Sequence, residues 1–199
     1  MCTSHEDAAN DLSENMLIFE DFITKQEETA LMNEIEPYMR RLRYEHDHWD
    51  DAIHGYRETE RRNWNEENSK VLKRVQDVAF PPPTAKLAYV HILDLQKTGY
   101  IKPHIDAVRF CGNTIAGLSL LSSSVMRLVH DKQKDKYADF LLKRRSLYIM
   151  RDKARYDYTH EVLDEDNSKF KGEIVPRERR ISVILRNEPD PEREEDFKS

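Results

Sequence analysis

Three scarcities mark this sequence: it has few cysteines, no long apolar run, and fewer basic than acidic residues. Cys2 and Cys111 are the only cysteines among 199 residues, too few for a disulfide-stabilised scaffold, which favours a reducing compartment. No apolar segment approaches the ~20 residues of a membrane-spanning helix, and the mean hydropathy of -0.83 indicates a polar surface. We expect one domain without a membrane span, long enough to bury a core.

Positive charge is the third scarcity. The chain carries 32 Lys and Arg against 38 Asp and Glu, a formal net charge of -6, which argues against general nucleic-acid binding driven by counterion release. Two short basic runs, 40–43 and 143–145, are interpreted as solvated faces. The first lysine or arginine is Lys25, so neither a mitochondrial transit peptide nor a secretory signal is visible.

The first part of the chain predicts helices. Residues 1–15 are interpreted as a disordered acidic lead. The helix that begins at a capping box near Thr24 should break or kink at Pro37. The segment 44–64 fits neither period and is predicted to be a structured loop. A second helix is expected over 65–80, with five apolar residues on its buried face: Val71, Leu72, Val75, Val78 and Ala79.

The remainder predicts strands. A turn at 97–99 is expected to separate the first two of the candidate segments, which are 87–95, 100–106, 114–121, 125–130, 146–150 and 181–185. Helices followed by many short strands predict an α+β domain with an antiparallel β core. We place this domain at 16–187 and expect a disordered charged tail at 188–199.

Two histidines and one aspartate are the candidate metal ligands. If His104 and Asp106 lie on a strand, both side chains point to the same face, and His160 can join them from a distant strand. Two imidazoles and a carboxylate are the ligand set of non-haem iron(II) oxygenases. Such a set leaves three metal positions open, two for a 2-oxo acid and one for dioxygen.

The last strand candidate supplies a second, independent argument. Arg180, Ser182, Ile184 and Arg186 share one face, and the apolar residues between them share the other, which is the face to bury. The two arginines lie roughly 20 Å apart at ~3.3 Å per residue. They could serve opposite ends of a short dicarboxylate, since guanidinium groups bind carboxylates bidentately and keep their charge.

Other residues are weaker candidates. His46, His48 and His54 form a loose pattern for a second metal site, although histidines in a loop are more often structural. The candidates for a substrate wall are Trp49, His54 and Tyr56. Arg155 and Tyr158 precede His160 and are candidates for fixing its orientation.

These motifs together resemble the AlkB-type iron(II)/2-oxoglutarate dioxygenases. The matching pieces are Gly99-Tyr100-Ile101-x-Pro103-His104-x-Asp106, then His160, then Arg180-x5-Arg186. The segments 44–55, 111–121 and 146–149 resemble a mitochondrial subgroup of the animal members.

The resemblance implies a double-stranded β-helix, or jelly-roll, core with N-terminal supporting helices. It implies iron(II) ligands at His104, Asp106 and His160. It also implies that Arg180 pairs with the distal carboxylate of 2-oxoglutarate, with three further residues beside the co-substrate: Tyr148, Ser182 and Arg186.

The implied activity is hydroxylation or oxidative demethylation of a macromolecule in the mitochondrial matrix, either methylated tRNA or a protein. The resemblance also implies links to programmed necrosis after alkylation damage and to fatty-acid metabolism. Duplex DNA is disfavoured, because the segment ahead of the strands is short and not basic. A basic rim at 143–145 would favour RNA, and an open, uncharged cavity mouth would favour a protein.

Two alternatives remain open at this point. The fold could keep iron and 2-oxoglutarate yet act mainly by recruiting a partner protein. It could instead be a cupin-type metalloprotein with additional ligands such as His91 or His130, a reading that leaves the arginine pair without a purpose.

Overall fold

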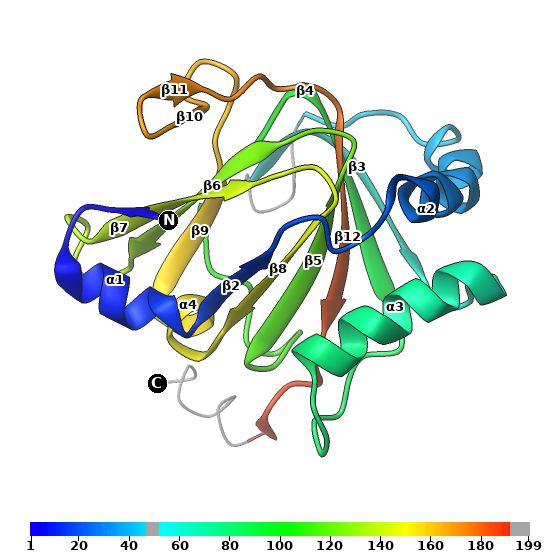
Figure 1. The fold of residues 1–199 in the computed structure, drawn as a ribbon, viewed down its shortest axis with the longest axis horizontal. Helices are drawn as coiled ribbons and strands as arrows, with labels where there is room; N and C mark the ends of the chain where they lie inside the picture. The colour runs from blue at the N-terminus through cyan, green and yellow to red at the C-terminus, as the bar shows by residue number, and fades with distance from the viewer. Residues whose placement is uncertain (47–51, 192–199) are drawn as a thin grey trace.

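A computed structural model describes residues 1–46 and 52–191. Ten described strands form one curled antiparallel sheet: β1 (Cys2–Thr3), β2 (Met16–Phe19), β3 (Ile53–Arg61), β4 (Val90–His104), β5 (Thr114–Leu120), β6 (Ser124–His130), β7 (Tyr137–Leu142), β8 (Ser146–Arg151), β9 (Tyr158–Val162) and β12 (Arg180–Arg186). Their order is β1-β7-β6-β9-β4-β12-β5-β8-β2, with β3 paired to β4 (Figure 1). A separate hairpin joins β10 (Lys169–Phe170) and β11 (Glu173–Ile174).

Strand β4 is the centre of this sheet. Its first half pairs with β12 and its last residues pair with β9, while β3 follows it on the other side. The predicted turn at 97–99 is wrong, because the strand continues through Gly99. A Cβ atom at Gly99 would lie 2.6 Å from the carbonyl oxygen of Gly55, so this glycine permits close approach of two backbones at an irregularity in β3.

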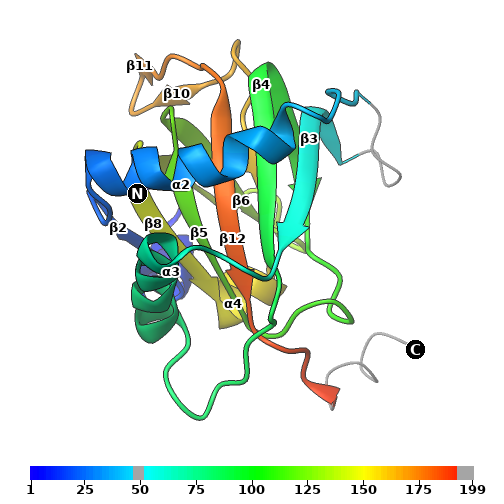
Figure 2. The same ribbon diagram turned by 90° about the vertical axis from the view of Figure 1, so that its right-hand side faces the viewer.

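Two apolar cores lie on the two faces of the sheet. The outer core packs the helices α2 (Lys25–Met39) and α3 (Glu66–Ala79) on the face that includes Ile181, Val183 and Leu185 (Figures 1 and 2). The inner core, within the curl, contains Ile184 of the same strand. The predicted alternation of β12 is therefore confirmed.

The long helices follow their sequence signals with two exceptions. Thr24 caps α2 with both hydrogen bonds of the capping box, but the helix does not end at Pro37. The predicted break is therefore not found: Pro37 removes its own N–H and one backbone hydrogen bond, but the helix continues past it to Met39. Helix α3 begins after its N-cap Asn65, and Val78 is exposed rather than on the buried face. No described helix is long and apolar enough to cross a membrane.

Two segments predicted to lack regular structure do form elements. In place of a disordered lead, 1–15 contains β1 and α1 (Glu6–Ser13), because Ala8 and Leu12 give that helix a fully buried face. The predicted loop 44–64 contains the edge strand β3. This strand is held to β4 by backbone hydrogen bonds, and its sequence does not alternate between apolar and polar residues. The sequence pattern therefore did not reveal it. Of the predicted tail, 192–199 lie outside the described residues.

Candidate metal centre

The three candidate ligands converge inside the curl of the sheet. His104 ends β4 and lies directly across from His160 on β9, and Asp106 follows two residues beyond the strand. Asp106 Oδ1 lies 3.3 Å from His104 Nε2 and 3.7 Å from His160 Nε2. One ligand atom from each residue falls within 4.8 Å of the others. The structure thus brings the three together, although Asp106 reaches the group from a loop and not from the strand.

The electrostatic state of the group suits a cation. His104 Nδ1 lies 2.9 Å from the carbonyl oxygen of Lys102, so Nδ1 donates and Nε2 keeps its lone pair. Burial, followed by the charge of His104, lowers the pKa of His160 to about 3. Burial alone would raise the pKa of Asp106, but the charge of Arg186 and the interactions with His104 and His160 together outweigh burial and hold that pKa well below its ordinary value. A neutral imidazole and an ionised carboxylate are the forms that bind metals.

Arg186 holds the second oxygen of Asp106. Its Nη2 and Nε lie 2.9 and 3.1 Å from Asp106 Oδ2, which leaves Oδ1 toward the histidines. Its Nη1 lies 3.2 Å from His91 Nδ1, and His91 Nε2 lies 2.8 Å from Glu58 Oε2. A hydrogen-bonded chain therefore runs from Glu58 through His91 and Arg186 to Asp106.

The sequence suggested His91 only as an additional ligand of a cupin-type site, gave no sign of Glu58, and gave Arg186 a co-substrate role only. The signal for His91 was its even spacing from Leu93 and Leu95, which face the inner core. Treating 90–104 as one strand would have placed His91 on the same face.

Arg180 occupies the other end of the same strand face. It is 1% exposed, its Nε donates to Ser119 Oγ at 3.1 Å, and its Nη2 is buried without a hydrogen-bond partner among the described residues. Burial lowers its pKa to about 10, which leaves it positively charged at neutral pH. Ser182 is buried beside it on β12.

These residues line one cavity of about 760 Å³. Its walls combine apolar side chains with the ligands and both arginines. Its polar and aromatic lining includes Glu58, Glu60, Tyr89, His91, His104, Asp106, Phe110, Tyr148, His160, Arg180, Ser182 and Arg186. Tyr148 is buried on β8, which raises the pKa of its hydroxyl, and its ring lies over Gly117 of β5.

The weaker candidates lie elsewhere or are engaged differently. His48 and Trp49 lie outside the described residues. Neither His54, which stacks on Tyr100, nor the buried Tyr56 lines the cavity. The guanidinium of Arg155 contacts Cys111 and Gly112, and the Tyr158 hydroxyl donates to Asp11. Neither donates to His160, whose Nδ1 is buried without a hydrogen-bond partner in the part of the chain that the structure describes.

The basic run 143–145 does not form a rim. Each member faces an acidic side chain, Glu20, Glu28 or Asp21 in turn, and none lines the cavity. A cupin-type site with extra ligands is also not found, since the described residues contain one group of three potential ligands. His130 instead accepts hydrogen bonds from the backbone of Lys132 and Gln133.

Comparisons with known proteins agree with this geometry. A family model described as the 2OG-Fe(II) oxygenase superfamily matches residues 3–186. Over 179 residues the chain is 51% identical to alpha-ketoglutarate-dependent dioxygenase alkB homolog 7, mitochondrial, of Mus musculus, covering 90% of this chain and 81% of that protein. The Bos taurus protein of the same name is 54% identical over 169 residues, covering 85% and 76%.

Solved structures resemble the fold at low sequence identity. OsALKBH1 superposes with a TM-score of 0.63 at 13% identity, covering 86% of this chain and 97% of that one. A prolyl-4-hydroxylase from Pseudomonas putida gives a TM-score of 0.60 at 13% identity, covering 92% and 98%. These likenesses confirm the predicted jelly-roll core.

Proposed function

This chain belongs to the 2OG-Fe(II) oxygenase superfamily and is an AlkB-like iron(II)- and 2-oxoglutarate-dependent dioxygenase, and from this premise we propose that His104, Asp106 and His160 hold the iron. When bound, iron and 2-oxoglutarate activate dioxygen, so that one oxygen atom enters a substrate C–H bond while the co-substrate becomes succinate and CO2. The protein orients these reactants and excludes water. Arg186 holds Asp106 ionised and turned so that Oδ1 faces the histidines.

The observation that carries the assignment is the incomplete pairing of Arg180. A buried guanidinium without a carboxylate partner is costly, yet Arg180 has a buried nitrogen with no partner among the described residues. It lies in the cavity that the three ligands line. A dicarboxylate with one end on the metal would supply the missing partner through a bidentate pair. Tyr148 and Ser182 then lie beside the co-substrate.

The proposals for the substrate and the compartment rest on relatives and resemblance, not on the geometry of the site. The names of both relatives include a mitochondrial location, which supports a mitochondrial protein, and we place it in the matrix. A protein or methylated tRNA is the proposed substrate, hydroxylated or oxidatively demethylated. Links to programmed necrosis after alkylation damage and to fatty-acid metabolism form part of the same proposal.

Replacing Arg180 tests the assignment. In Arg180→Met, 2-oxoglutarate should no longer raise the melting temperature of the iron-loaded protein under nitrogen, whereas ligand at a hundredfold its Kd adds about 2.7 kcal/mol in the wild type. The ligand-free variant should melt no lower than the wild type, because an unpaired buried charge is gone.

The matched control is Arg127→Met, which removes an arginine paired with Asp139 away from the cavity and should retain the 2-oxoglutarate shift. A full shift in Arg180→Met would show that the distal carboxylate binds elsewhere.

A further inference from the structure

Arg186 binds only one of the two oxygens of Asp106. Its Nε and Nη2 both donate to Oδ2, at 3.1 and 2.9 Å. An arginine beside a carboxylate frequently forms two parallel hydrogen bonds, one to each oxygen, and that arrangement is a strong one. Here it would turn Oδ1 away from His104 and His160, which Oδ1 now approaches to 3.3 and 3.7 Å. A further contact must therefore hold the guanidinium group on Oδ2.

His91 supplies that contact. The remaining nitrogen of the guanidinium group, Arg186 Nη1, lies 3.2 Å from His91 Nδ1. Because a guanidinium group has N–H donors and no acceptor, Nδ1 must present its lone pair to Arg186. His91 thus accepts from Nη1 while Asp106 accepts from Nε and Nη2. The three nitrogens are held between two partners, which fixes both the position and the plane of the guanidinium group.

Glu58 selects the tautomer of His91 that can accept from Arg186. His91 Nε2 lies 2.8 Å from Glu58 Oε2, and since a carboxylate only accepts, the ring proton lies on Nε2. The other tautomer would direct an N–H group of the ring at the N–H groups of Arg186. A carboxylate can accept several hydrogen bonds at once, so a further donor to Glu58 does not compete with His91.

Three neighbouring strands place these side chains in one row. His91 on β4 lies directly across from Ile184 on β12 and from Glu60 on β3. Residues two apart on a strand share a face, so Arg186 and Glu58 lie diagonally across from His91, within reach of long side chains. All three line the cavity. The register of the sheet therefore sets the row, with no loop between Glu58 and Arg186.

Building on the proposed function, we propose that His91 is a positioning residue for the iron site. By holding Nη1 of Arg186, it keeps the guanidinium group on Oδ2 of Asp106 and leaves Oδ1 for the metal. Glu58 acts one step further away, by fixing the tautomer of His91. His91 is not itself a member of the group of three ligands. It acts through Arg186, and its loss would allow the two-oxygen pair that occupies Oδ1.

The affinity of the full chain for iron(II), measured by isothermal titration calorimetry under nitrogen, tests this proposal. Partners that orient metal ligands change metal affinity by about 10- to 100-fold, so His91→Leu, which acts through Arg186, should weaken iron binding about tenfold. His91→Asn places an amide oxygen close to the position of Nδ1 and should regain most of the affinity. His91→Gln places its amide close to Nε2, where it can contact Glu58 but not Arg186, and should bind iron as weakly as His91→Leu.

His130→Leu is the matched control. Nδ1 of His130 also accepts from N–H groups, those of Lys132 and Gln133, but His130 does not line the cavity. This variant should keep the iron affinity of the wild type even where its melting temperature falls. An equal loss of iron affinity in His130→Leu and His91→Leu would show general damage and overturn the inference.

Wild-type iron affinity in His91→Leu would also overturn the inference. If His91→Leu does not fold, the comparison of His91→Asn with His91→Gln decides, since both keep a polar amide at this position, and equal iron affinity of the two would refute the role of Nδ1. The wild type separates this inference from the proposed function. A wild-type protein that binds no iron refutes the ligand set itself, whereas tight wild-type binding with unchanged variants refutes only the role of His91.

Discussion

A single glycine determines where Tyr148 can lie. Gly117 and Tyr148 are direct partners across β5 and β8, and a Cβ atom at Gly117 would lie 2.4 Å from the tyrosine ring. The ring therefore occupies the space that a larger residue would fill. In the sequence, Gly117 stands out only as one member of the segment 111–121.

Gly117→Ala should displace that ring. We expect a loss of about 1–3 kcal/mol in the free energy of unfolding, typical of overpacking, and weaker 2-oxoglutarate binding. Urea unfolding and titration with the co-substrate measure the two effects. Adding Tyr148→Leu removes the clash, so the double variant should recover stability but not co-substrate affinity. Additive losses in stability would show that the two residues do not interact.

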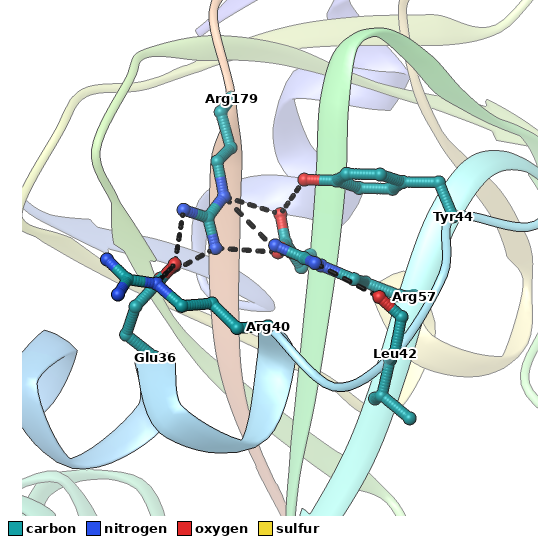
Figure 3. Close-up of polar contacts among 7 residues, drawn as sticks. Glu36, Arg40, Leu42, Tyr44, Arg57 and Arg179 are labelled. Carbon is teal, nitrogen blue, oxygen red and sulfur yellow. Dashed lines mark hydrogen bonds and ion pairs between the residues drawn. The ribbon is translucent and has the colours of Figure 1, made fainter.

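At the scale of elements, a buried carboxylate joins four of them. Asp94 of β4 is fully buried and accepts hydrogen bonds from Tyr44 at 3.1 Å and from Arg57 of β3 at 2.7 Å. Arg179, which precedes β12, donates to Asp94 at 2.8 Å and to Glu36 of α2 at 2.9 Å (Figure 3). Because Arg179 is held in this cluster, the cluster fixes the start of β12, whose first residue is Arg180.

Removing the charge of Asp94 should be costly. Asp94→Asn leaves two arginines without their shared carboxylate, and breaking a buried pair in this way costs about 3–5 kcal/mol. Urea unfolding would measure it. Asp77→Asn, which removes an exposed partner of Lys73 on α3, is the control and should cost less than about 1 kcal/mol. Similar losses in both would mean that the cluster contributes little.

The same cluster gives a dependence on pH. Burial alone would raise the pKa of Glu36, but hydrogen bonds from Arg179 and Arg40 outweigh it and lower the pKa below 4.5. The stabilisation is therefore complete above the unfolded pKa and is lost as the pH falls through the folded one. Glu36→Gln should be less stable than the wild type at neutral pH, and the difference should vanish in acid. A difference independent of pH would contradict this reading.

The elements also show what the sequence could predict. Strong periodic signals predicted α3 and most residues of β5, β6, β8 and β12, and the spacing of polar residues predicted a group of three ligands. Local patterns could not show that Gly99 lies within a strand, because its role depends on Gly55, a distant residue. For the same reason the contact between Glu58 and His91 could not be predicted until β3 and β4 were known to pair.

At the scale of the whole molecule, the N-terminal segment belongs to the folded unit. Leu12 of α1 is fully buried in the inner core, the cluster that also contains Tyr148 and Ile184 of the cavity wall. Asp11 beside it accepts hydrogen bonds from Lys153 and from Tyr158, the first residue of β9. The segment therefore supports the strand that carries His160.

Leu12→Ala should accordingly destabilise the entire domain. Truncating a fully buried leucine costs about 2–5 kcal/mol, which thermal unfolding would detect. Leu42→Ala, at a leucine that is 39% exposed, should change stability by less than about 0.5 kcal/mol. Equal effects would restore the interpretation of 1–15 as an unstructured lead.

Strand β4 makes chain length as important as residue identity. It carries His91 into the cavity, Asp94 to the opposite face and His104 toward the ligand group. Side chains alternate regularly from His91 to Ile101, before the irregularity that precedes His104, so one residue inserted in that stretch would exchange the two faces around it and turn cavity residues outward without altering any of them. Insertions and deletions should therefore be tolerated in the surface loops of this protein but excluded between His91 and Ile101, where the number of residues is itself a component of the site.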